Sequence, residues 1–338
     1  MYSLVLQSAL DIADGEKKAI AEAVKTEGGV LVFNQQSFVG NGIVQIDGQS
    51  RYVEGIPAKG YAVVRPREIR GSVACEDRRL ENDFFVVPFD EHYEITSLYD
   101  KVACCEVIDT SKGTGNQIEV YKDYPRDYDA WEITNYYKEK KYPLNAIERV
   151  TFLQDGARAG VEIARRFLGS TFVQKIWLYE DIKRIDFETD VDWKQEHLLM
   201  KAEFPVRINV DRATYELQFG ALERPTHSNT SWDAAKFEVC GHKYCDFSEY
   251  DYGVAMLNDC KYGHDIHDGV MRLTLLKSSN YPNPAADKCQ HTFTYSLVSH
   301  EGDYRAAGVV QMAYDCHCSR GAGWHPARIL QFRFCCSG

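Results

Sequence analysis

Cysteine and histidine gather in two stretches of this sequence, and their spacing raises the question of a zinc site. The candidate ligands are Cys240, His242, Cys245, Cys260, His264 and His267. Structural zinc sites use two close ligand pairs, the cysteines of a pair being about two to four residues apart. The pattern fits poorly, because Cys240 and Cys245 lie in one strand-like run, where residues five apart point to opposite faces. We therefore expect no metal site in this chain and interpret the cysteines as small buried apolar residues.

Other catalytic patterns are equally weak. No cysteine carries a local nucleophile signature, and any pairing with the ten histidines would be arbitrary. The glycines of "SKGTGNQ" (111–117) are not followed by a helix or by the Lys-Ser/Thr ending of a phosphate-binding loop. The fifty acidic residues single out no carboxylate pair for acid–base chemistry. The residues alone therefore indicate a β-sandwich able to bind a ligand.

Composition excludes several classes of protein. The 338 residues are 44% hydrophobic and 26% charged, as in ordinary globular proteins of one to three domains. A formal net charge of −11 without a dense Lys/Arg run argues against a nucleic-acid partner. The absence of a run of about eighteen apolar residues argues against a membrane span. Since no export signal precedes the eleven cysteines, we expect reduced thiols and a cytoplasmic location.

Alternation with a period of two dominates the sequence after residue 73. In 184–193, Ile185, Phe187, Val191 and Trp193 alternate with charged residues, which predicts a strand with one buried and one wet face. Similar runs recur between Gly, Asn, Asp and Pro clusters without a long helix between them. This pattern indicates an antiparallel sandwich of many strands and a mainly β fold.

The amino-terminal part differs from the rest. Residues 1–29 carry apolar residues at helical spacing and close on Gly28 and Gly29, as one or two helices would. Short β-type runs follow in 30–66, where the turn Pro57–Gly60 predicts a hairpin. A tyrosine-rich excursion occupies 119–143, and we leave open whether its rings pack on the sandwich or face a ligand.

Five strings taken together resemble one protein family in order and spacing. They include "ERPTHSNTSWDAAKFEVCGHKYCDFSE" and "YGVAMLNDCKYGHDIHDGVMRLTLLKSSNYPNP", and they occupy 80–101, 127–134, 223–249, 252–284 and 293–315. The resemblance is to the carboxyl-terminal half of class II α-mannosidases, glycoside hydrolase family 38, in its cytosolic and bacterial branch.

This resemblance implies a division of the chain. The predicted parts are the end of a helical bundle (1–29), a small β domain (30–72), a large galactose-mutarotase-like β-sandwich (73–315) and a tail foreign to the family (316–338). We interpret the Cys-, Arg- and Gly-rich tail as translation from a shifted reading frame or as the artefact of a truncated gene.

The family resemblance also implies an activity that this chain would not perform alone. Members are retaining glycosidases that remove terminal α-linked mannose, and retention requires a nucleophilic and an acid–base carboxylate about 5–5.5 Å apart. In the family these carboxylates, and a zinc ion held by two histidines and two aspartates, belong to an amino-terminal barrel. No residue here matches them, so we expect no catalytic residue and an inactive isolated chain. The implied partners are a mannose-containing oligosaccharide and the barrel, and self-association stays open.

The β-sandwich of such an enzyme is expected to close one side of the sugar pocket. By their position in the family-like strings, His242 and Lys243 are the first candidates to approach the sugar. The polar residues expected around them are Arg224, His227, Asn229, Asn258, Asp259 and Lys261. Each could instead cap a turn or bond within the sandwich. Two other functions stay open, a stand-alone carbohydrate-binding sandwich and a zinc-binding interaction module.

Overall fold

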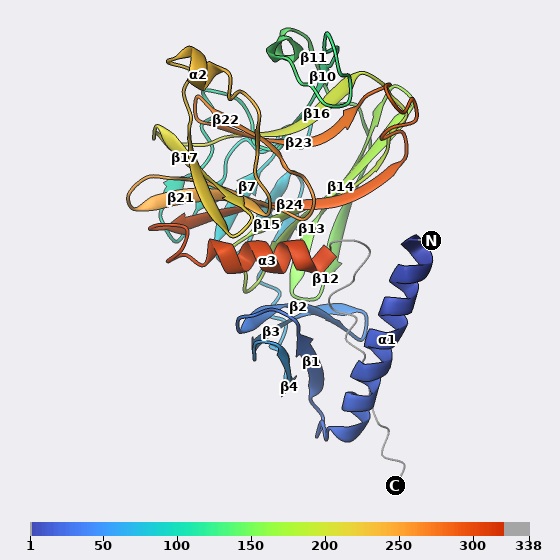
Figure 1. Cartoon of the computed structure of the whole chain (residues 1–338). Helices are drawn as coiled ribbons and strands as arrows, with labels where there is room; N and C mark the ends of the chain where they lie inside the picture. The colour runs from blue at the N-terminus through green and yellow to red at the C-terminus, as the bar shows by residue number, and fades with distance from the viewer. Residues whose placement is uncertain (1, 321–338) are drawn as a thin grey trace. The chain divides into compact units, whose positions relative to one another are not determined.

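Antiparallel β-sheet makes up most of the regular structure in the computed structural model of this chain, which describes residues 2–320 (Figure 1). The described residues form two units, 2–70 and 71–320, and each is considered by itself. None of the helices within 2–320 combines the length and the apolar character needed to cross a membrane.

The first unit consists of one long helix and two small sheets. α1 (Tyr2–Ala23) is a single helix, and several of its apolar side chains are exposed, among them Leu4, Val5 and Ile12. The small sheets pair β1 (Val30–Asn34) with β4 (Gly60–Val64) and β2 (Gly40–Ile46) with β3 (Gln49–Ile56). Their core is formed by Val32, Val44, Val53 and Ile56.

The hairpin predicted at Pro57–Gly60 is wrong. This turn joins β3 to β4, which belong to different two-stranded sheets. The hairpin of this unit lies instead between β2 and β3, where Asp47 and Gly48 have φ angles of 52° and 77°. A two-residue turn with both φ angles positive follows the right-handed twist of paired strands, and an Asp-Gly pair suits it.

The second unit is a β-sandwich whose larger sheet has nine strands. Their order is β12-β13-β14-β15-β24-β21-β20-β17-β18, and all pairs are antiparallel. The strands are β12 (Ile147–Asp155), β13 (Arg158–Phe167), β14 (Ser170–Tyr179), β15 (Ile185–Asp192), β17 (Arg212–Leu217), β18 (Gly220–Pro225), β20 (Tyr244–Ser248), β21 (Tyr252–Asn258) and β24 (Gln290–Glu301).

A six-stranded and a five-stranded sheet complete the second unit. The six-stranded sheet has the order β11-β10-β16-β23-β22-β19, and the five-stranded sheet runs from β5 to β9 in sequence order. Their strands are β5 (Ala74–Glu76), β6 (Arg79–Glu81), β7 (Phe85–Pro88), β8 (Tyr99–Asp100), β9 (Cys105–Glu106), β10 (Gln117–Lys122), β11 (Lys141–Pro143), β16 (Leu198–Pro205), β19 (Val239–Cys240), β22 (Gly263–His267) and β23 (Val270–Ser278). The short helices are η1 (Asn135–Glu139) and α2 (Ser231–Ala234).

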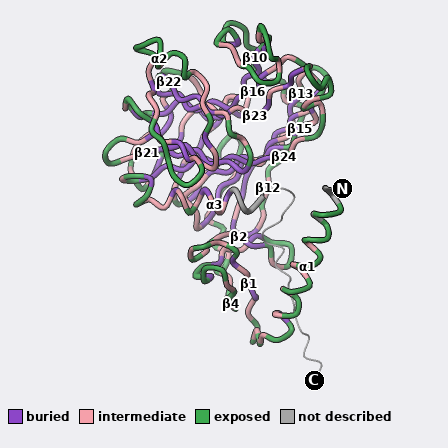
Figure 2. The backbone as a smooth tube through the Cα atoms, in the orientation of Figure 1, coloured by how far each residue is buried: buried purple, intermediate pink, exposed green. Residues whose placement is uncertain are grey.

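One hydrophobic core joins the sheets of the second unit, and Figure 2 shows its strands as the most buried part of the chain. Phe187 of β15 packs against Phe204 of β16 at a ring-centroid distance of 5.4 Å and against Tyr295 of β24 at 4.9 Å. Aromatic rings of the nine-stranded and six-stranded sheets therefore meet across the sandwich. The prediction of a mainly β, antiparallel fold is confirmed.

The wet face predicted for β15 is partly buried. Asp186 is 1% exposed, and its carboxylate accepts hydrogen bonds from Tyr179 and Ser296 and pairs with Arg184. The helix α3 (Val309–Arg320) packs over β21, β24 and β20 of the same sheet. The predicted boundary between 315 and 316 falls within this helix, and residues 321–338 of the predicted aberrant tail lie outside the described residues.

Candidate functional site

The ends of neighbouring strands bring most of the predicted site residues together. β20 begins directly after His242 and Lys243. Because β20 is antiparallel to β21, its start lies beside the end of β21 at Asn258, and the amide of Asn258 donates to the carbonyl of Lys243 over 3.0 Å. Asp259 and Lys261 follow in the turn after β21. The pairing of β20 with β21 thus brings together residues from two of the family-like strings, 223–249 and 252–284.

Glu216, near the end of β17, holds the start of β20 in place. Its Oε2 accepts the backbone amide of Lys243 at 2.9 Å, and its Oε1 accepts the Lys243 Nζ at 3.0 Å. Burial of Lys243 lowers its pKa, but the hydrogen bond and the charge of Glu216 outweigh burial and raise the pKa above its ordinary value. The Lys243 ammonium also lies 4.4 Å from the ring centroid of Tyr314. Lys243 is therefore a positively charged positioning residue.

Asn258 and Asp259 are buried, and their side chains bond to backbone groups around the turn. Asn258 is fully buried, and its Nδ2 donates to the carbonyl of His242 at 2.6 Å while its Oδ1 accepts the amide of Lys261 at 2.7 Å. The Asp259 carboxylate accepts the amide of Thr294 at 2.9 Å. These bonds satisfy buried polar groups. Asn258 thereby positions the backbone of His242 and Lys261, and Asp259 connects the turn to Thr294 of β24.

The outer side chains of this group lie at the edge of an open cavity of about 410 Å³. The ring of His242 packs against Tyr262 at a centroid distance of 4.9 Å. Lys261 and Tyr262 themselves line the cavity. The other lining residues are Ala130, Cys260, Gly263, Thr274, Leu275, Leu276, Lys277, Ser279, Ala286, Asp287 and His291.

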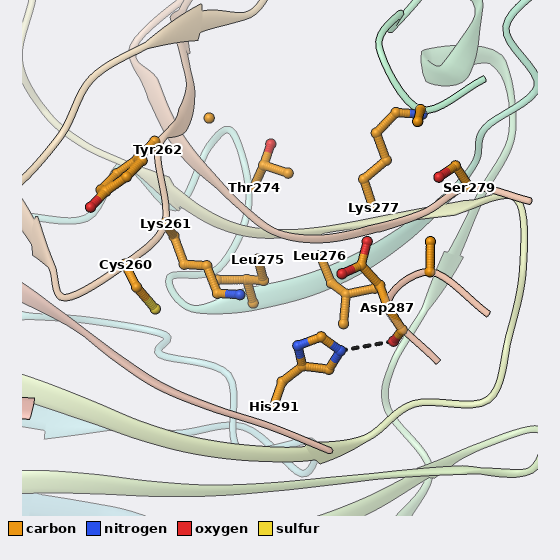
Figure 3. A pocket seen from close by; sticks show the side chains of 13 residues that line it. Cys260, Lys261, Tyr262, Thr274, Leu275, Leu276, Lys277, Ser279, Asp287 and His291 are labelled. Carbon is orange, nitrogen blue, oxygen red and sulfur yellow. Dashed lines mark hydrogen bonds between the residues drawn. The ribbon is translucent and has the colours of Figure 1, made fainter. Parts of the chain in front are cut away.

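The cavity combines hydrogen-bonding groups with an aromatic wall. Figure 3 places Cys260 and Tyr262 on one side and Asp287 and His291 on the other. The Nε2 of His291 donates to the carbonyl of Asp287 at 2.8 Å, which fixes this loop against the start of β24. Among the described lining residues the only carboxylate is Asp287. Glycoside hydrolysis usually requires two carboxylates.

Three of the predicted site residues lie elsewhere. Arg224, at the end of β18, donates to the carbonyl of Cys240 at 2.7 Å and covers the ring of Tyr215 at 4.8 Å from its centroid. His227 and Asn229 belong to the turn before α2, where the amide of Asn229 donates to the His227 Nδ1 at 3.4 Å. Arg224 thus connects two strands, and His227 and Asn229 bond to each other within a turn.

Several residues of the site were not predicted from the sequence, among them Glu216, Tyr262, Lys277, Asp287 and His291. Glu216 stands in the alternating run "ATYELQF", where it resembles any outward-facing strand residue. Tyr262 directly precedes β22, Lys277 lies in β23, Asp287 in the connection to β24 and His291 in β24. All four line the same cavity as Lys261. No local signal in the sequence marks these residues.

The cysteines and histidines of the candidate zinc site do not fit a metal. The expected single run from Cys240 to Cys245 is two strands in different sheets, because the chain crosses between them at Gly241, where an added Cβ would lie 2.9 Å from His264. Cys245 faces the hydrophobic core, whereas Cys240 is exposed. Burial lowers the pKa of His264 to about 3. Within residues 2–320 no group of three or more His, Cys, Asp or Glu side chains could hold a metal ion.

Comparison with known proteins places the chain among glycoside hydrolases. Residues 80–285 match the model of the glycosyl hydrolases family 38 C-terminal domain. Alpha-mannosidase 2C1 of Homo sapiens is 36% identical over 280 residues, which cover 77% of this chain and 26% of the human protein. Alpha-mannosidase G of Dictyostelium discoideum is 34% identical over 303 residues, covering 86% of this chain and 27% of that protein. The chain thus spans about a quarter of the length of these curated relatives.

A solved structure has the same fold. The glycosyl hydrolase family 38 protein of Enterococcus faecalis superposes with a TM-score of 0.64 at 11% sequence identity. The superposition covers 86% of this chain and 39% of that protein. At this level of identity the likeness concerns the fold alone. The matches to the family model and to the curated relatives confirm the family resemblance predicted from the sequence.

Proposed function

The chain belongs to glycosyl hydrolase family 38 through the C-terminal domain of that family, and from this premise we propose that it forms the β part of an α-mannosidase. The complete enzyme would hydrolyse terminal non-reducing α-D-mannose residues with retention of configuration. The observation that carries the proposal is the family match over residues 80–285, which include His242, Lys243 and Lys261 but end before Asp287 and His291 of the cavity. The curated relatives, which carry the name alpha-mannosidase, support the choice of substrate.

In this proposal the chain binds sugar and another part of the enzyme cleaves it. Lys261 supplies donors from an ammonium that makes no ion pair with a described carboxylate, and Asp287 supplies acceptors. Tyr262 supplies an aromatic face beside them, and aromatic rings pack well against the apolar faces of ligands. The nucleophile, the acid–base carboxylate and the zinc ion would belong to a catalytic barrel, with which this chain would associate.

The proposal is tested by complementation. The chain would be produced alone and together with a polypeptide that carries the barrel and helical bundle of a family member, and release of the aryl group from an aryl α-mannoside would be measured. We expect activity only when both polypeptides are present. If the pair stays inactive while the barrel polypeptide regains activity with the β part of its own enzyme, the proposal is wrong.

A lysine pair separates binding from general effects on the fold. Lys261→Ala removes the ammonium from the cavity, whereas Lys236→Ala removes an exposed ammonium that follows α2. The loss of one hydrogen bond from a charged group lowers affinity by roughly tenfold or more. We expect a KM raised by about this factor for Lys261→Ala in the complemented enzyme and an unchanged KM for Lys236→Ala.

A second function, that of a stand-alone carbohydrate-binding module, is favoured by one observation. Every lining residue of the cavity comes from the second unit of this chain. A module of this kind would bind mannose-containing oligosaccharides without any other polypeptide and would not restore activity to a barrel. Calorimetric titration of the isolated chain with mannose, beside the complementation assay, distinguishes the two functions.

We also propose that the protein acts in the cytoplasm. The eight cysteines whose state the structure describes are free thiols, as a reducing compartment would keep them. Self-association is part of the same proposal, because several apolar side chains of α1 are exposed. Sedimentation of the purified chain at several concentrations would measure it.

A further inference from the structure

Exposed aromatic rings surround one edge of the cavity. Tyr128 and Trp131 are 67% and 68% exposed, and they flank Ala130, which lines the cavity. Tyr281 is 66% exposed and follows the lining residue Ser279 by two positions. The two segments that carry these rings are more than a hundred residues apart in the sequence, yet both reach the same cavity.

Hydrogen bonds tie the two segments together. The Oδ2 of Asp129 accepts the backbone amides of Asn280 and Tyr281 at 2.6 and 3.0 Å. Burial raises the pKa of Asp129, but these two bonds and the nearby positive charges outweigh it and hold the pKa below its ordinary value. From the cavity wall, the Lys277 Nζ donates to the carbonyl of Asp129 at 2.9 Å and pairs with the buried carboxylate of Asp123. The backbone that carries these rings is therefore held in place by hydrogen bonds between the two segments.

The rings differ in whether their faces are available. Tyr124, on the same excursion, stacks on His197 at a centroid distance of 4.3 Å and is approached by the Lys122 ammonium at 4.8 Å. Tyr124 is therefore engaged with its own chain. By contrast, Tyr128, Trp131 and Tyr281 make no ring contact with any residue in 2–320. An aromatic ring with a free face offers a large, rigid contact area at a small cost in conformational entropy.

We propose that Tyr128, Trp131 and Tyr281 form an aromatic rim that binds the second and third sugar of an α-linked manno-oligosaccharide whose first sugar occupies the cavity. This inference rests on the proposed function and adds a subsite to it. The volume of the cavity, about 410 Å³, lies near the lower end of the range of small-molecule sites, about 300–1,000 Å³. A longer oligosaccharide must extend out of the cavity, and the rim lies at its edge.

The surroundings of the rim favour a sugar over a protein surface. Polar residues neighbour the rings along the chain: Asp127 and Asp129 flank Tyr128, and Asn280 precedes Tyr281. The only exposed aliphatic residue between Tyr128 and Trp131 is Ala130. A sugar ring presents an apolar C–H face and a border of hydroxyl groups, so it uses aromatic faces and adjoining carboxylate or amide groups together. A protein-binding patch would need a contiguous apolar surface.

The test compares mannose with an α-linked mannotriose by calorimetric titration of the full chain. Tyr128→Gly is a suitable variant because Tyr128 has a φ angle of 54°, which glycine adopts without the steric cost of a Cβ. Trp131→Ala removes the neighbouring ring. The control is Tyr250→Ala, since Tyr250 is 99% exposed in the turn at the other end of β21, about 20 Å from the cavity turn at 3.3 Å per strand residue.

We expect the trisaccharide to bind more tightly than mannose. Each rim variant should weaken trisaccharide binding roughly three- to tenfold, the measure of one aromatic stacking contact, and leave mannose binding unchanged. Tyr250→Ala should change neither. In a Trp232→Phe/Trp324→Phe background, the trisaccharide should also protect Trp131 from acrylamide quenching, because Trp177 and Trp193 are already buried.

Two failures can be told apart. If mannose binds but the rim variants leave trisaccharide affinity unchanged, the rim is refuted and the proposed function stands. If neither sugar binds the chain, alone or with the barrel polypeptide, the proposed function fails and the rim fails with it. If the rim variants abolish association with the barrel polypeptide and spare sugar binding, the rings are a contact surface between domains and the inference is overturned.

Discussion

The Glu216 carboxylate gives the sharpest test of how the site is held. Glu216 is 6% exposed and accepts two hydrogen bonds from Lys243, one from the backbone amide at 2.9 Å and one from Nζ at 3.0 Å. Glu216→Gln keeps the shape of the side chain and one acceptor oxygen. The amide NH2 that replaces the second oxygen cannot accept, so one of the two bonds is lost and a donor faces a donor.

The magnitude follows from the bond that is lost. A hydrogen bond that involves a charged group contributes about 1.5–3 kcal/mol to stability. Because the Lys243 side chain is 18% exposed, we take a value in the lower half of this range, about 2 kcal/mol, for its bond to Glu216. For a unit of this size such a loss lowers Tm by roughly 4–8 °C. Urea unfolding followed by the fluorescence of the buried Trp177 and Trp193 measures the second unit alone.

The pH dependence adds an independent check. The pKa of Lys243 is raised in the folded chain, so its contribution to stability is complete at neutral pH and is lost only as the pH rises above the ordinary lysine pKa of 10.5. The difference between the parent and Glu216→Gln should therefore be constant from pH 6 to about pH 9. Glu223→Gln, at an exposed position of the adjacent β18, should change stability by less than about 0.5 kcal/mol. Equal stabilities for Glu216→Gln and the parent would refute this account of the site.

Three further predictions concern the second unit. Because burial lowers the pKa of His264 to about 3, the unfolded chain binds the extra proton first, and stability should fall by up to roughly 1.4 kcal/mol per pH unit below pH 6.5; urea titrations of His264→Asn should lack this slope. Burial raises the pKa of Asp315 to about 6, so its ionisation opposes folding as the pH rises from 4 to 7, and Asp315→Asn should raise Tm at pH 8 but not at pH 4. Gly160→Ala would place a Cβ 2.1 Å from the carbonyl oxygen of Ile176 and should cost about 3 kcal/mol or more, whereas Gly220→Ala, with open space around it, should be nearly neutral in the same denaturation assay.

The strands were the most predictable feature of this protein. Ile185, Phe187 and Val191 are buried, as their alternation indicates, because side chains of a strand point to opposite faces in turn. The same alternation could not show that Asp186 would also be buried. Its carboxylate bonds to Ser296 of β24, which lies more than a hundred residues later, and the ion pair with Arg184 compensates the buried charge.

Strand pairing was less predictable than strand position. From the sequence we predicted a hairpin at Pro57–Gly60 and overlooked the Asp47-Gly48 pair, whose positive φ angles form the turn between β2 and β3. The run from Cys240 to Cys245 was likewise interpreted from the sequence as one strand. The segment is divided between two sheets, since β19 pairs with β22 in one sheet and β20 pairs with β17 and β21 in the other.

For the candidate site, the sequence by itself determined only part of the set, because the family-like strings contain His242, Lys243 and Lys261 but not Glu216, Asp287 or His291. Only the tertiary structure decided the role of each residue. Asn258 and Asp259 are drawn inward by backbone groups that need partners, whereas Lys261 is left at an open cavity. Side-chain alternation is a local property that each strand carries in its own sequence. What covers a strand, and which distant residue completes a hydrogen bond, depends on contacts between segments far apart in the chain, as the bond from Lys243 to Glu216 illustrates.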